Sequence, residues 1–160
     1  MGTLRTIVLL GLLLGVVSSG NGPSAAQVIL PEQEPDAVKE CRKAADAGDV
    51  MAMYSLGLMY AEGRGVPKDE AEAVKWYRKA ADAGNTKAIC NLAYMYWSGR
   101  GVERDYVESY AWYSVAADLG EQVAAKGRDS VVGELTAESF VAAQKRAGIL
   151  KEQVGKAKAR

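Results

Sequence analysis

One segment of this 160-residue chain occurs twice, with a spacing of 36 residues. Residues 52–84 read AMYSLGLMYAEGRGVPKDEAEAVKWYRKAADAG, and residues 88–120 read AICNLAYMYWSGRGVERDYVESYAWYSVAADLG. The two copies carry glycine, alanine and aromatic residues at the same places, as in the pair Trp76 and Trp112. A fixed period of about 20 to 50 residues is typical of a repeat array, whose units bury apolar side chains against their neighbours.

Each copy has the pattern of two helices. Ala52, Leu56 and Tyr60 recur with a spacing of four residues, which places them on one face of a helix. Gly63 follows this helix and is expected to end it, because glycine accepts the left-handed backbone of a helix end. Asp69, three residues before a glutamate, is typical of the start of the second helix. That second helix is expected to bury Ala73, Trp76, Tyr77, Ala80 and Ala81.

The two copies resemble the Sel-one-like repeat, a relative of the tetratricopeptide repeat. The resemblance rests on Ala-x-x-x-Leu-Gly-x-x-Tyr, Gly-x-Gly-Val, Trp-Tyr and Ala-Ala-x-x-Gly, with Ala93 in the second copy where the first has Gly57. It implies an all-α fold, a right-handed α/α superhelix (a tetratricopeptide-like solenoid) of antiparallel helix pairs. The repeats are placed at 36–120, as a partial copy at 36–48 and full copies at 50–84 and 86–120.

The repeat pattern fades after residue 120. Residues 121–148 are expected to form C-terminal capping helices, the second of which begins at Thr136 and ends at Gly148. Residues 149–160 are basic and contain few large apolar side chains, so they are expected to form a frayed tail. The side chains expected to face inward in the last helix are Phe140, Val141, Ala143 and Ala147.

The N-terminal segment predicts export. A single charge, Arg5, precedes a short apolar run and then small residues, so residues 1–26 have the pattern of a signal peptide. Cleavage is expected after Ala26 or, alternatively, near Ser19. Residues 27–35 contain two prolines and are interpreted as a linker. The mature chain would be periplasmic or secreted; if the segment stayed uncleaved, it would anchor the chain in the membrane.

The composition of the chain argues against several classes of function. The chain has 20 basic and 20 acidic residues, so no positive surface for nucleic acid is expected. It has no histidine and no Ser-x-x-Lys or Gly-x-Ser-x-Gly motif, so neither a serine mechanism nor a histidine metal site is expected. No cofactor is predicted. Cys41 and Cys90 are expected to be separate thiols, because their aligned positions lie on different faces of neighbouring helix pairs.

Arg64 and Arg100 lie between glycines in equivalent loops. A phosphate site is one hypothesis for them. It lacks the preceding strand and the following Lys-Ser/Thr of such loops, which favours solvated arginines or pairing with Asp69 and Asp105.

The resemblance implies that the first helix of each pair lines a concave groove, which in this family commonly binds a peptide or protein. The copies differ from each other at these positions and agree at the packing positions. Their aromatic residues are either anchors for a partner or filling between helices. Asn91 could pair with the backbone of a ligand, whereas a clamp for a free C-terminus is not supported. The predicted groove residues are Met51, Tyr54, Leu58, Lys87, Cys90, Asn91, Tyr94 and Trp97, with Ala61, Glu62 and Ser98 beside them.

The sequence therefore favours a non-catalytic, exported adaptor that binds a protein or peptide partner through this groove. Two alternatives stay open. One is a hydrolase of the β-lactamase or penicillin-binding type, an activity ascribed to cysteine-rich relatives of the family. The other is a structural envelope protein whose groove is filled by a second copy or by the basic tail.

Overall fold

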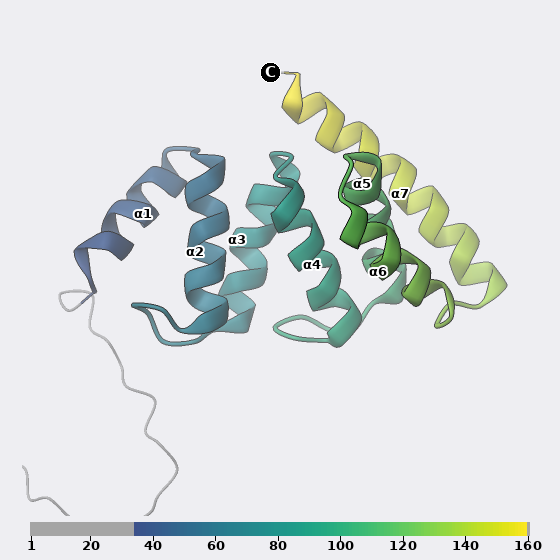
Figure 1. Cartoon of the computed structure of the whole chain (residues 1–160), viewed down its shortest axis with the longest axis horizontal. Coiled ribbons are helices and arrows are strands. Elements are labelled where there is room, and N and C mark those ends of the chain that lie inside the picture. Colours follow the sequence, from purple (N-terminus) through teal and green to yellow (C-terminus); the bar gives the residue numbers. More distant parts are fainter. Residues whose placement is uncertain (1–33, 160) are drawn as a thin grey trace, which may run out of the picture.

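The computed structural model of the chain describes residues 34–159, which form an elongated stack of helices (Figure 1). The predicted signal peptide and residues 27–33 of the predicted linker lie outside the described residues. Within residues 34–159 there are seven helices and no strands, and none of these helices has the length and apolarity to cross a bilayer. The helices are α1 (Asp36–Asp46), α2 (Val50–Glu62), α3 (Glu70–Asp82), α4 (Thr86–Ser98), α5 (Tyr106–Asp118), α6 (Gln122–Val132) and α7 (Ala137–Lys158).

Consecutive helices pack on one another in chain order, so the predicted all-α solenoid is confirmed. The two full repeats correspond to the pairs α2–α3 and α4–α5, while α1 packs on α2, and α3 on α4. The buried side chains form two clusters, one around Leu56 and one around Leu92 and Trp112, and the partly buried Met53 and Tyr60 contact both. Leu56, Leu92 and Trp112 are all 0% exposed.

The ends of the first helix in each repeat are fixed by residues at equivalent positions. Asp49 and Asn85 cap α2 and α4, each accepting a hydrogen bond of 2.9 Å from a backbone N–H three residues on. Gly63 and Gly99 end the same helices with φ of 73° and 71°, a left-handed conformation that favours glycine. The predicted end of the first helix at Gly63 is confirmed, and Gly99 repeats it.

The predicted capping at the start of the second helices is confirmed in part. The Asp69 carboxylate accepts from the N–H of Ala71 at 2.9 Å and of Glu72 at 3.0 Å. The side chain of Glu72 pairs with Lys75, so it does not complete the reciprocal half of a capping box. At the start of α1 the cap position is occupied by Pro35, and Asp36 is already the first residue of the helix.

The prediction of a frayed C-terminal tail is wrong. Helix α7 passes through Gly148 without interruption and continues to Lys158. Leu150 and Val154 are 1% and 2% exposed, because they continue the helix face that packs against α5. Val141, predicted to face inward, is 64% exposed because it lies outside this face, the buried members of which are Ala143, Ala147, Leu150 and Val154.

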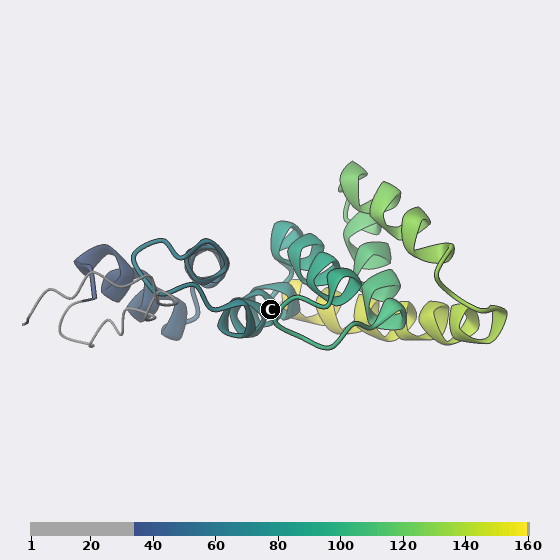
Figure 2. The same cartoon turned by 90° about the horizontal axis from the view of Figure 1, so that it is seen from below.

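The last two helices extend the two rows of the stack. Helix α6 packs on α5 and also contacts α4, whereas α7 packs on α5 and reaches α3. Figure 2 shows them diverging on different sides of α5. The row of α2, α4 and α6 makes up the first-helix face, which carries the predicted groove residues.

Candidate binding surface

Two neighbouring hollows lie on the first-helix face. The α2–α4 hollow has a volume of about 250 Å³ and includes polar groups of Asn91 and Arg100 in its lining. Its apolar part comes from both helices and from α3 beneath them. The other lining residues include Leu58, Ala61, Glu62, Tyr77 and Tyr94.

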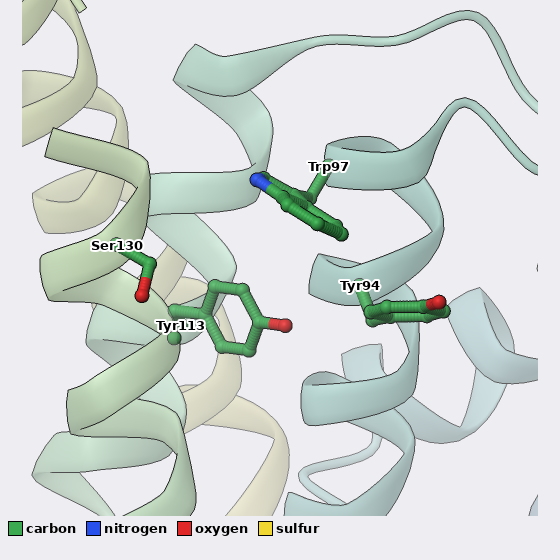
Figure 3. Close-up of a pocket in the computed structure, with 5 residues that line it drawn as sticks. Tyr94, Trp97, Tyr113 and Ser130 are labelled. Atoms are coloured by element: carbon green, nitrogen blue, oxygen red, sulfur yellow. The ribbon is translucent and has the colours of Figure 1, made fainter. Parts of the chain in front are cut away.

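The α4–α6 hollow is the more aromatic of the two (Figure 3). Its volume is about 190 Å³, and it is lined by Tyr94, Trp97, Tyr113, Gly127 and Ser130. Tyr94 and Trp97 come from α4, with their ring centroids 5.8 Å apart and their planes tilted by 34°. Tyr113 and Ser130 face them from α5 and α6, and the Tyr113 hydroxyl points toward the two α4 rings (Figure 3). Because Tyr94 lines both hollows, the two form one continuous surface.

Part of the predicted groove comes together in these hollows. Leu58 and Asn91 line the α2–α4 hollow, Trp97 lines the α4–α6 hollow, and Tyr94 lines both. The remaining predicted residues, Met51, Tyr54, Lys87 and Cys90, line neither of them.

Those remaining residues differ in what they contact. Met51 is 59% exposed near the start of α2, with its sulfur 3.5 Å from the Asn85 amide nitrogen. Tyr54 is half-buried, and its ring centroid lies 6.1 Å from that of Tyr77, so it fills space between helices as the alternative interpretation expected. Cys90 is also half-buried, and both it and Cys41 are free thiols.

Tyr77, which the sequence suggested only for packing, lines the α2–α4 hollow, and its equivalent in the second repeat, Tyr113, lines the α4–α6 hollow. The ring of Tyr77 lies on Gly57, where a β-carbon would come within 2.6 Å of it. The equivalent residue of the second repeat is Ala93, whose β-carbon excludes the same placement of the Tyr113 ring. Tyr113 lies instead against α6, where a β-carbon on Gly127 would be 2.7 Å from its ring.

The different placement of the Tyr113 ring could be recognised from the alignment of the repeats. Gly127 stands 36 residues after Asn91, just as Ala93 stands 36 residues after Gly57. Alanine in place of glycine at position 93 adds a β-carbon on the α4 side of the Tyr113 ring. Glycine in place of asparagine at position 127 removes a side chain on the α6 side. Together they account for the different walls of the two hollows.

The hydroxyls of Tyr77 and Tyr113 in the hollows, and the thiol of Cys90 on the same row of helices, keep their protons around pH 7. Burial raises the pKa of Tyr77 and of Tyr113 to about 12 each, although the Asn91 amide beside Tyr77 acts in the opposite direction. Burial, assisted by Glu121, raises the pKa of the Cys90 thiol to about 11. The tyrosine hydroxyls are therefore available as hydrogen-bond donors, and Cys90 lacks the thiolate that a reactive cysteine needs.

The loop arginines pair with acids, but not with those that the sequence suggested. Arg64 contacts Glu62 at 2.7 Å, and the Arg100 Nε donates to Glu70 at 3.1 Å. Asp69 and Asp105 are occupied as helix caps, which explains why they are not the partners. Arg100 and Lys68 lower the pKa of Glu70 to about 2. Within residues 34–159, no group of His, Cys, Asp or Glu side chains could hold a metal ion.

Stacked helix pairs with side-chain hollows along one row define a helical-repeat protein of the tetratricopeptide-like kind. The Sel1 repeat pattern matches residues 50–85 and 86–121. A Sel1 repeat protein from Oxalobacter formigenes is 42% identical with a TM-score of 0.58, over 62% of this chain and 75% of that one. The chain belongs to the Sel1 repeat family.

Two further solved structures are similar. One is c5321, a protective antigen present in uropathogenic Escherichia coli strains that displays an SLR fold; it is 36% identical with a TM-score of 0.72 over 78% of this chain. The present chain spans only 27% of the length of c5321. The other is the cysteine-rich protein B of Helicobacter pylori, with 24% identity and a TM-score of 0.55 over 59% of this chain and 73% of that one, which supports the fold alone. No curated protein matches the sequence.

Proposed function

We propose that this chain is an exported, non-catalytic adaptor that holds a protein or peptide partner on its first-helix face. Sel1 repeat proteins commonly serve as scaffolds for protein interactions. The observation that carries the proposal for this chain is the pair of hollows joined at Tyr94. They offer a continuous surface on which an extended segment can place successive side chains.

The exposure of the aromatic residues supports the same assignment. Tyr94 and Trp97 are 42% and 39% exposed, although both side chains are large and apolar. Aromatic side chains of this kind are favoured anchors in interfaces, because they bury much area while losing little conformational freedom. Neutral Cys90, by contrast, gives no support to a nucleophilic hydrolase.

Replacing Tyr94 and Trp97 with alanine is expected to abolish partner capture from envelope extracts while leaving the helical content unchanged. Both side chains are partly exposed, so their loss removes binding area more than core packing. Affinity capture with the purified chain as bait, followed by circular dichroism of the same samples, measures both effects.

The matched control replaces Val141 and Ile149 with alanine; they are 64% and 43% exposed on α7 and line neither hollow. This variant is expected to capture the partner as well as the original chain does. Equal loss of capture in the two variants, or undiminished capture by the first, would show that the first-helix face is not the binding surface.

Export is proposed from the N-terminal sequence, and the similar protein c5321, a protective antigen, supports a role outside the cytoplasm. Expression of the full chain in a Gram-negative host is expected to give a periplasmic or secreted product that begins at Gln27. N-terminal sequencing of the fractionated protein checks this. A product that keeps Met1 and stays with the cytoplasm would contradict it.

A further inference from the structure

The lining of the α4–α6 hollow combines aromatic surface with hydrogen-bond donors. Apart from the rings of Tyr94, Trp97 and Tyr113, it contains only Gly127 and Ser130, so no charged side chain lines it. Within residues 34–159, no hydrogen bond to another side chain is found for the Tyr113 hydroxyl or the Trp97 indole N–H, both of which line the hollow. The pKa of Tyr113, about 12, means that its hydroxyl keeps its proton.

This lining selects against a charged occupant. A lysine, arginine or carboxylate side chain would lose hydration in the hollow without meeting an opposite charge among the lining residues. Arg100, which lines the neighbouring hollow, contacts the Tyr94 hydroxyl and is already paired with Glu70. A neutral occupant is therefore favoured.

The unpaired donors select further among neutral occupants. A backbone segment that matches them must offer accepting carbonyls and must not bring N–H groups of its own that stay unpaired. Proline-containing segments in the polyproline II conformation meet both conditions, since proline has no N–H and the carbonyls of this helix make no internal hydrogen bonds. Their flat, apolar rings pack well on aromatic faces, and the segment is ordered before it binds.

We propose that the α4–α6 hollow binds a proline side chain from an extended segment of the partner, with Tyr113 and Trp97 donating hydrogen bonds to the adjacent carbonyls. The proposal rests on the function proposed above and specifies the chemistry of the partner. Asn91, in the adjoining α2–α4 hollow, is placed to pair with the backbone of the same segment beyond the proline. Gly127 is the specificity-determining residue, because it allows the Tyr113 ring to lie against α6 and leaves the hollow open.

Titration of the ¹⁵N-labelled chain with the peptide Ala-Pro-Pro-Ala-Pro-Pro-Ala tests the proposal. The indole N–H signal of Trp97, assigned with the variant Trp97→Phe, is expected to shift in a saturable way. A peptide with alanine in place of each proline, and another with lysine, are expected to bind about tenfold more weakly or not at all. Equal binding of either peptide, or no saturable shift with the proline peptide, overturns the proposal.

Two substitutions test the hollow itself. Gly127→Ala is expected to weaken the proline peptide at least about tenfold, because the new methyl group displaces the Tyr113 ring. Gly148→Ala is the control, since a β-carbon there has nothing within 4 Å, and it is expected to bind as the original chain does. Tyr113→Phe keeps the ring, removes the donor and is expected to weaken binding several-fold; it decides the matter if Gly127→Ala does not fold. Unchanged affinity in the folded Gly127→Ala and Tyr113→Phe variants contradicts the assignment.

The experiments distinguish failure of the proline assignment from failure of the proposed binding surface. If the proline peptide does not bind, but the partner is still lost when Tyr94 and Trp97 are replaced, the first-helix face binds a segment of other chemistry. Concentration-dependent self-association that the proline peptide does not compete with would identify a second copy as the occupant and would likewise overturn the proline assignment.

Discussion

Replacing both Leu150 and Val154 with alanine is expected to lower the free energy of unfolding by about 4 kcal/mol, because two buried aliphatic side chains are truncated. The two side chains are 1% and 2% exposed, and they join the C-terminal half of α7 to the core of the second repeat. Urea denaturation followed by circular dichroism measures the change.

The control exchanges the neighbouring Ile149 and Gln153 for alanine. Ile149 is 43% exposed and Gln153 is exposed, so this pair is expected to change the free energy of unfolding by less than about 0.5 kcal/mol. A frayed tail would make the two double variants equally stable. That outcome would contradict the docking of α7 along α5.

Replacing Gly101 with alanine is expected to lower the free energy of unfolding by about 3 kcal/mol. Gly101 has φ of 68°, and an alanine in this left-handed conformation costs about 1 to 2 kcal/mol. In addition, its β-carbon would lie 2.2 Å from the backbone oxygen of Glu70, in the preceding repeat. Because backbone cannot rotate away as a side chain does, the loop must shift, and overpacking of this kind costs about 1 to 3 kcal/mol more.

Gly120→Ala separates the two contributions. Gly120 has φ of 93°, but a β-carbon there would have nothing within 4 Å. Its replacement is therefore expected to cost only the conformational part, about 1 to 2 kcal/mol. Equal losses in urea denaturation of the two variants would mean that the loop after α4 does not approach α3 closely.

Much of the fold could be predicted from local sequence signals. Asp49, Asn85, Gly63 and Gly99 act within four residues along the chain, through hydrogen bonds and backbone conformations that each residue type favours. The 36-residue period then indicates that successive pairs pack in the same way. Both signals are independent of distant contacts, so they can be recognised without the structure.

The incorrect predictions concern features that depend on contacts between residues far apart in the sequence. Gly148 would end an isolated helix, but burial of Leu150 against α5 outweighs the cost of a glycine within α7, which is about 1 kcal/mol. The partner of Arg100 is Glu70, 30 residues earlier and in the other repeat. Local spacing favoured Asp105, which the helix cap already uses.

The shape of the α4–α6 hollow also depends on contacts that the sequence alone does not reveal. Ala93 and Gly127 are visible as departures from the repeat, but their effect depends on a ring that lies between α4, α5 and α6. The place of Tyr113 in the repeat, equivalent to that of Tyr77, therefore indicates packing, whereas the structure places its hydroxyl in the hollow (Figure 3). The departures lie beside this hollow, and the packing of three helices determines its shape.

The dissociation constant of the captured partner for the original chain and for the Tyr94→Ala/Trp97→Ala variant tests the central claim most directly. If the first-helix face is the binding surface, the variant binds at least about 100-fold more weakly, corresponding to about 2.7 kcal/mol for two interface anchors, and its helical content is unchanged. A dissociation constant that is equal for the two folded proteins would contradict the claim.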